Sequence, residues 1–459
     1  MKIIVLNGSP KGTTSVTMQY IYYIQQEFPE HELKILNISQ QLKKIEKNTQ
    51  AFQDILNEIN SSDGVLWASP VYYFLIPANY KRFIELISEK NAEDVFRNKY
   101  TAFLTTSIHI FDHTAHNYMN AVCDDLNMKY TGSFSADMYD LLKPEEKKRL
   151  CVFAKIFFDA IKKNTHTLRR YIPLIWQDFD YTPGDTKSKI DAGSKKILIV
   201  TDAVENQRNL IRMIEKFKAS FSNKVETINL NDLDIKGSCL GCISCGYDNK
   251  CVYEGKDEYI NFYNTKVKNA DILVWAGTIK DRYLSAKWKT FFDRSFFTGH
   301  VPSLFGKQIG FIISGPLSQT PNLIQVLEGY TELQDANPVG FVTDEEGDSA
   351  KIDSMLEAFG KRFVWFAEND YCKPNTFLGV GVKKIFRDDI WGWMRFPFRA
   401  DHLAYKKIGR YDFPQKQYKI RIQNAIMLLL SKSAVFRKEV KKRMKQEMIK
   451  PLQKVFRDR

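Results

Sequence analysis

A repeat within the chain limits what it can fold into more than any other feature. Residues 63–85 align without gaps to residues 271–293 at an offset of 208. The opening apolar run, residues 2–5, matches residues 196–199 at an offset of 194. Identical positions in the longer match are Asp63/Asp271, Trp67/Trp275, Ala68/Ala276, Ala78/Ala286, Lys81/Lys289 and Phe83/Phe291. Such self-similarity indicates two copies of one folding unit, the second enlarged by an insertion between its second and third strands.

Five apolar runs in the first copy alternate with segments of helical periodicity. The runs lie near residues 3–6, 32–38, 64–68, 101–106 and 130–134. Their spacing suits right-handed βαβ crossovers, so we predict an α/β protein with two doubly wound, parallel five-stranded sheets. We place a first domain at 1–165, a linker at 166–194, a second domain at 195–370 and a basic helical extension at 371–459.

The first strand leads into a loop of glycine and hydroxyl residues, residues 7–17, and then a helix. Free backbone N–H groups, hydroxyl donors and the positive end of a helix dipole are typical of a phosphate site. The loop matches neither G-x-G-x-x-G nor G-x4-G-K-[ST], so it indicates no dinucleotide or nucleoside-triphosphate motif. An ordinary turn, with Thr14 or Ser15 capping the helix, is the alternative.

Two more loops, residues 69–74 and 106–116, follow strands at the same edge of the first sheet, where ligands bind in such folds. The later loop carries three histidines, His109, His113 and His116. They could bind a metal or donate to a ligand. Alternatively, they line a cleft or start a helix capped by Asp112.

These loops resemble those of the flavodoxin-like NAD(P)H-dependent FMN reductases. The resemblance rests on Gly8-Ser9-Pro10, Ser69-Pro70-Val71-Tyr72 and Pro77-Ala78-Asn79-Tyr80-Lys81-Arg82-Phe83. It implies two flavodoxin-like domains and an FMN phosphate held by Ser9, Lys11, Thr13, Ser15 and Thr17. It also places the flavin ring beside Pro70, Val71, Tyr72, Tyr73 and Phe74, with Thr106, Ser107 and His109 in the third loop. The family usually has glycines in that third loop, where this chain has histidines.

Four of the seven cysteines fall within thirteen residues, in the pattern C-x2-C-x2-C-x5-C. This spacing wraps three thiolates around one face of an iron–sulfur cubane and lets a fourth close it. Structural zinc sites usually separate their two cysteine pairs more widely, which makes zinc the weaker alternative. A disulfide or an unliganded thiol cluster is the other. We therefore predict a [4Fe–4S] cluster on Cys239, Cys242, Cys245 and Cys251.

The two copies differ in the loop after the first strand. In the second copy, residues 201–207 contain Asp202 and Glu205 but no glycine or serine. Acidic side chains repel a phosphate dianion, so we do not expect FMN there. A flavin loop in one copy and a cysteine motif in the other resemble the iron–sulfur flavoproteins, in which cofactors of neighbouring subunits approach each other. The resemblance implies that the two domains imitate such a dimer within one chain.

The function implied is an FMN-dependent oxidoreductase, linked to NAD(P)H or an electron carrier, that passes electrons between FMN and the cluster. A plain NAD(P)H-dependent FMN reductase without a cluster is one alternative. A non-enzymatic electron carrier or redox sensor is another.

The net charge of +13 is concentrated at the C-terminal end. Residues 371–459 contain 23 Lys and Arg against 7 Asp and Glu, whereas the remaining residues contain 44 against 47. This distribution argues against a nucleic-acid enzyme and indicates a basic appendage. We expect residues 415–456 to form a basic amphipathic helix with a break at Pro451, whose partner could be an acidic protein or an anionic membrane. No long apolar run or secretory signal is evident, so we expect a cytoplasmic protein, with peripheral membrane association as an alternative.

Overall fold

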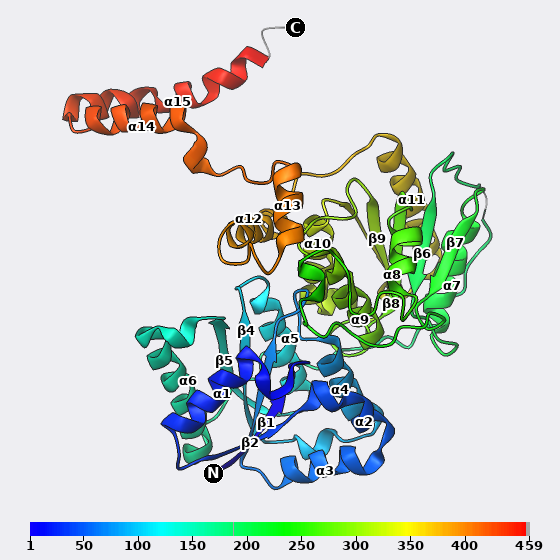
Figure 1. The fold of residues 1–459 in the computed structure, drawn as a ribbon. Helices are drawn as coiled ribbons and strands as arrows, with labels where there is room; N and C mark the ends of the chain where they lie inside the picture. Colours follow the sequence, from blue (N-terminus) through cyan, green and yellow to red (C-terminus); the bar gives the residue numbers. More distant parts are fainter. Residues whose placement is uncertain (187, 456–459) are drawn as a thin grey trace. The chain divides into compact units, whose positions relative to one another are not determined.

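The computed structural model describes residues 1–186 and 188–455, which divide into two compact units, Met1–His402 and Leu403–Arg459. The first unit contains two parallel five-stranded sheets with helices on both faces of each (Figure 1). The fold prediction is thereby confirmed. The predicted extension starts at 371, whereas the unit boundary lies at 402, so its first part belongs to the larger unit.

The first sheet has the strand order β2-β1-β3-β4-β5, and the five predicted strands are all present. Buried side chains of α1 and α6 pack on one face of the sheet, while Trp67 on the other face contacts Tyr80 of α4. The strands are β1 (Lys2–Asn7), β2 (Glu32–Leu36), β3 (Gly64–Pro70), β4 (Tyr100–Ser107) and β5 (Lys129–Asp137). The helices are α1 (Val16–Glu27), α2 (Ile38–Lys47), α3 (Thr49–Asn60), α4 (Ala78–Glu89), α5 (Asp112–Asp125) and α6 (Pro144–Lys163).

The second sheet repeats this topology, with the order β7-β6-β8-β9-β10. Even small contacts recur: Lys2 N donates to Asp63 Oδ2 at 2.7 Å, and Lys196 N donates to Asp271 Oδ2 at 2.9 Å. The strands are β6 (Ile197–Thr201), β7 (Val225–Asn229), β8 (Ile272–Thr278), β9 (Gln308–Ser314) and β10 (Asn337–Thr343). The helices are α7 (Arg208–Ala219), α8 (Tyr259–Phe262), α9 (Ala286–Arg294), α10 (Pro321–Leu333) and α11 (Ser349–Glu368). The duplication is confirmed, and the cysteine segment lies between β7 and β8 as predicted.

Equivalent helices of the two domains, α4 and α9, pack against each other through reciprocal contacts. Ala78 N donates to Asp293 Oδ2 at 2.8 Å, and Ala286 N donates to Glu85 Oε1 at 2.6 Å. Each contact thus pairs the first residue of one helix with a carboxylate near the end of the other. Such self-complementary pairing is the arrangement of a two-fold symmetric dimer, here made within one chain.

The C-terminal residues begin with α12 (Phe377–Trp391) and α13 (Arg399–Lys407), followed by α14 (Tyr418–Leu430) and α15 (Ala434–Val455). The predicted position of the break in the last helix is wrong. The helices separate at residues 431–433, where Ser433 Oγ accepts a hydrogen bond from Phe436 N, and α15 continues through position 451. Phe456 lies outside the described residues. Within the described part of the chain, no helix is long and apolar enough to cross a membrane.

Candidate functional site

The loop after β1 leads into the N-terminus of helix α1. Ser15 caps α1 by accepting a hydrogen bond from Met18 N at 3.3 Å, so the predicted capping role of this residue is confirmed. Val16 and Thr17 begin the helix, and N–H groups in a first turn have no acceptor within their own helix. They lie at the positive end of the helix dipole, which suits an anion.

The predicted phosphate-binding side chains surround this helix start. Ser9 is buried, and its Oγ accepts a hydrogen bond from Lys11 N at 3.3 Å. Lys11 and Thr13 are exposed. Thr17 Oγ1 lies 2.7 Å from Thr106 Oγ1, which joins this loop to the end of β4. The structure therefore brings the first and third predicted loops together at one edge of the sheet.

The second loop, residues 70–74, follows β3 and folds into a tight turn. Tyr72 N donates to Leu75 O at 2.8 Å, and Leu75 N donates back to Tyr72 O at 3.1 Å. Tyr73 and Phe74 have φ values of 36° and 67°, in the left-handed region that non-glycine residues rarely adopt. Strained loops of this kind are common at ligand sites. Burial raises the pKa of both Tyr72 and Tyr73 well above the usual value, so both remain neutral phenols.

The third loop is organised by Asp112 at the start of α5. His109 Nδ1 lies 3.1 Å from Asp112 Oδ2, and the hydrogen bond between them raises the pKa of His109. Asp112 Oδ1 accepts from His113 N, close to the predicted helix-start role. His116 instead turns inward to Thr105 Oγ1, and burial lowers its pKa to about 4. The three histidines form no metal site among the described residues.

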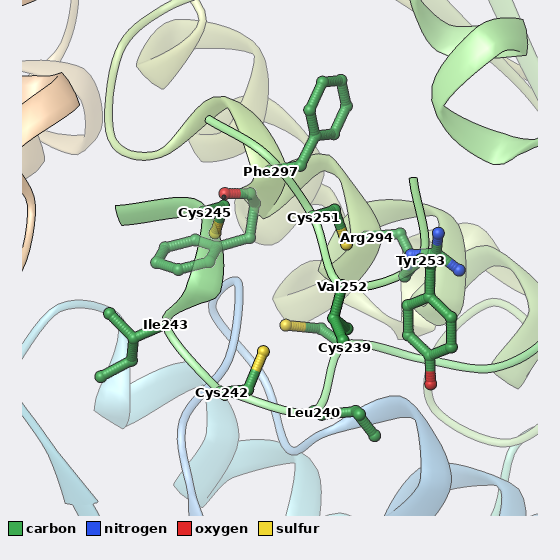
Figure 2. A pocket seen from close by; sticks show the side chains of 11 residues that line it. Cys239, Leu240, Cys242, Ile243, Cys245, Cys251, Val252, Tyr253, Arg294 and Phe297 are labelled. Carbon is green, nitrogen blue, oxygen red and sulfur yellow. Dashed lines mark hydrogen bonds between the residues drawn. The ribbon is translucent and has the colours of Figure 1, made fainter. Parts of the chain in front are cut away.

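The four clustered cysteines line a single cavity, together with residues that include Arg294, Phe296 and Phe297. Figure 2 shows their side chains around this common space. All four are free thiols, so the disulfide alternative is not realised. Burial raises the pKa of Cys239 and of Cys245 to about 12, unlike the lowered pKa of a reactive redox thiol. Across the described residues, however, no three Cys, His, Asp or Glu side chains are arranged as a formed metal site.

Arg294 is the buried cation at this cavity. Its terminal nitrogens donate to both oxygens of Asp257, at 2.7 and 3.0 Å, and to Gly237 O at 2.9 Å. The guanidinium also stacks over Tyr253, 4.3 Å from the ring centre. Its Nε is buried, and none of the described residues accepts a hydrogen bond from it. The cavity thus has an unsatisfied donor in its wall, which an anionic occupant would complete.

The cysteine segment touches the predicted flavin loops of the first domain. Gly241, between Cys239 and Cys242, has a φ of +61°, and a side chain there would collide with Tyr72 Oη. A Cβ atom added to Gly241 would also lie 3.3 Å from Lys11 Cε. A residue of the cysteine loop therefore lies against both the second loop and the phosphate loop of the other domain, without intervening protein.

Residues 397–399, at the start of α13, form a further wall beside the cysteines, a position that sequence reasoning did not predict. Pro397 O packs against Gly246, and the Arg399 guanidinium lies 4.7 Å from the centre of the Tyr247 ring. Phe398 is buried against Phe296. The alternation of arginine and aromatic residues in this segment was the available signal, and it marks packing on the protein body.

Residues 1–137 match the family model described as NADPH-dependent FMN reductase. We refer to this part of the chain as the FMN reductase domain, after the family model that it matches. No curated protein matches the chain. Similar solved structures include the NAD(P)H:acceptor oxidoreductase FerB of Paracoccus denitrificans, at 18% identity over 35% of this chain and 97% of that one, with a TM-score of 0.27. An FMN-dependent NADH-azoreductase of Bacillus anthracis is 15% identical over 36% and 99% of the two chains, with a TM-score of 0.26.

The family match agrees with the resemblance that the three loops carry, and it is limited to the first domain. The matched residues end at Asp137, the last residue of β5. The family match therefore covers the whole first sheet and its three loops. The cysteine segment and the second domain lie outside the matched residues.

In the second domain, side chains occupy the sheet edge that corresponds to the flavin loops of the FMN reductase domain. Asp202 stands at the position of Gly8 and accepts hydrogen bonds from Ser285 Oγ and from Trp288 Nε1. Burial raises the pKa of this carboxyl to about 6. Asn209, in the first turn of α7, donates to Phe179 O at 2.8 Å and accepts from Tyr181 N at 2.8 Å. Linker residues therefore occupy the helix start that would receive a phosphate.

Proposed function

We propose that this chain is an FMN-dependent NAD(P)H oxidoreductase that exchanges electrons between one FMN and a [4Fe–4S] cluster. FMN would lie on the three loops of the FMN reductase domain. Cys239, Cys242, Cys245 and Cys251 would hold the cluster. The observation that carries the proposal is the contact of Gly241 with Tyr72 and Lys11, because it joins the cysteine loop directly to the flavin loops.

The residues at the flavin loops fit FMN. The phosphate would meet the free N–H groups of Val16 and Thr17, the hydroxyls around them and the cationic Lys11. When bound, FMN takes a hydride from a nicotinamide and can release the two electrons singly. Tyr72 and Tyr73 would supply half-buried, neutral aromatic surface beside the ring position and would limit its contact with water.

The cysteine cavity offers the ligands and charge balance that a cluster needs. Four thiolates around an iron–sulfur core carry net negative charge, and hydrogen bonds to the sulfurs stabilise it. The unpartnered Nε of Arg294 would supply such a bond, while Asp257 holds the guanidinium in place. Pro397 and Phe398 cover the loop from the side of the C-terminal segment and would limit its access to solvent.

One flavin per chain follows from the linker. The second domain presents Asp202 in place of a glycine and binds Phe179 and Tyr181 at its helix start. A phosphate there would meet a buried carboxyl and an occupied helix turn. In this proposal the second domain carries the cysteines and covers the flavin loops of the first domain.

A second candidate is a plain FMN reductase without a cluster. It is favoured by the family model, which covers the three flavin loops and not the cysteine segment. In that case the cysteine loop would only cover the flavin loops, and electrons would leave FMN for a diffusible acceptor.

The experiment is a count of cofactors on the full chain purified without oxygen, with NADPH oxidation measured in parallel. We expect one FMN and about four iron and four sulfide per chain. Cys245→Ala should lose iron and retain FMN, whereas Cys372→Ala, at an exposed cysteine outside the loop, should keep both. FMN without iron after attempted reconstitution, or one zinc per chain, would reject the cluster. Absence of any NADPH turnover would reject the enzymatic role.

A further inference from the structure

The second compact unit exposes an unusual amount of apolar surface. None of the thirteen residues of α14 is buried. Its apolar residues Tyr418, Ile422, Ile426 and Leu429 recur every three or four positions and so share one face of the helix, and each is at least 53% exposed. Scattered apolar residues on a surface are ordinary, but a contiguous patch of this kind marks a surface that another body covers.

Helix α15 also exposes apolar side chains. Its exposed apolar residues are Val435, Met444, Met448, Ile449 and Leu452. Lysines and arginines alternate with them, and Lys441, Lys442 and Arg443 are consecutive exposed cations. Arg443 pairs with Glu439, but acidic side chains are few in this helix.

The net positive charge of the chain comes from this unit. Residues 403–459 contain 17 Lys and Arg against 4 Asp and Glu, a net charge of +13, which is the charge of the whole chain. Residues 1–402 are therefore neutral overall. The unit that exposes the apolar face of α14 is also the one that attracts anions.

We propose that α14 and α15 bind the surface of an anionic lipid bilayer. A lipid surface takes up both features at once, since acyl chains cover the apolar side chains and anionic headgroups attract the lysines and arginines. A partner that offered acidic side chains alone would neutralise the cations but leave the apolar face of α14 in water. The proposal places the oxidoreductase at a membrane surface, where electron carriers dissolved in lipid are available to it.

The test is sedimentation of the full chain with vesicles of phosphatidylcholine, with and without phosphatidylglycerol. We expect binding to vesicles that contain phosphatidylglycerol, weakened by added salt because the attraction is partly ionic. Replacing both Leu428 and Leu429 by Glu should weaken binding by more than about tenfold, since each buried leucine contributes to partition. Lys441→Gln with Lys442→Gln should reduce binding to the anionic vesicles only.

The matched control replaces both Val152 and Ile156 by Glu, which places the same two charges on exposed apolar positions of α6 in the other unit, and it should bind as the unmodified chain does. All these positions are exposed, so the variants should fold, and circular dichroism checks that they do. The proposal is overturned if the unmodified chain stays in the supernatant with anionic vesicles, or if the two leucine changes leave binding intact. It is also overturned if light scattering shows a dimer that the leucine changes dissociate, because a second copy would then cover the patch.

Discussion

The two sheets of this chain share one strand order and differ at the edge where their first helices begin. In the FMN reductase domain, Gly8 directly follows β1, and the ring of Tyr80 lies on it. In the second domain, Asp202 fills that place and Trp288 donates to it. The pairs Gly8/Asp202 and Tyr80/Trp288 show that the core of a duplicated domain can be retained while its ligand edge is rebuilt.

The same asymmetry appears in the contact between the domains. Lys81 of α4 is buried and shared between Glu85 and Asp281, at 3.0 and 2.9 Å. Its counterpart Lys289 has one carboxylate, Asp293, and the carbonyl oxygen of Tyr72. The lysine of the second domain therefore reaches into the turn of the second flavin loop. The interface keeps its two-fold pattern in the backbone contacts but uses one of its lysines to support the site.

The largest effect should come from giving the first domain the edge of the second. Gly8→Asp places a side chain against the Tyr80 ring and a carboxylate next to the phosphate position. We expect complete loss of FMN, measured by flavin absorbance after purification. Combining Gly8→Asp with Tyr80→Trp recreates the pair of the second domain and should recover thermal stability without recovering FMN. Flavin retained in the double variant would show that the edge residues do not decide which domain binds it.

The next effect concerns the two buried lysines. Asp293→Ala leaves Lys289 without a carboxylate, and an unpaired buried charge should lower the free energy of unfolding by about 3–5 kcal/mol. Glu85→Ala is the matched change in α4, and it should cost about 1–3 kcal/mol because Lys81 keeps Asp281. Urea unfolding measures both. Equal losses would mean that the two helices are interchangeable.

Because Asp202 can ionise and its counterpart Gly8 cannot, Asp202 should make the free energy of unfolding depend on pH. Burial raises the folded-state pKa of Asp202 to about 6 from 3.8. Its contribution to stability is therefore complete below about pH 4 and is lost as the pH rises through about 6. Relative to Asp202→Asn, the unmodified chain should lose about 3 kcal/mol between these values. The measurement is the difference in unfolding free energy between the two proteins at pH 4 and pH 7; a constant difference would contradict the shift.

The smallest effect should follow Trp176→Ala in the linker. The Trp176 ring lies against Gly315 at the end of β9 and is 50% exposed, so its loss should cost only about 1 kcal/mol. FMN content should stay at one per chain, because Asp202 and the contacts of Asn209 remain. Binding of a second FMN by this variant, followed by flavin fluorescence, would show that the linker alone closes the second site.

The sequence by itself determined the fold of each domain. Continuous apolar runs and period-3.6 patterns, which depend on neighbours along the chain, predicted the strands and the helices between them, and the 208-residue offset revealed the duplication. The three flavin loops could also be predicted, because parallel strands place their carboxyl ends at one edge. The C-x2-C-x2-C-x5-C motif located the cysteine cavity within the chain.

Only the tertiary structure decided which loops, cysteines and linker residues contact one another. The contact of Gly241 with Tyr72 joins residues 169 positions apart, and no local pattern specifies it. The same holds for the linker at Asn209, for Arg294 in the cavity wall and for Pro397 over the cysteine loop. These contacts depend on how two folded domains meet. Helix α4 packing on α9 sets that meeting, through side chains whose partners lie in the other half of the chain.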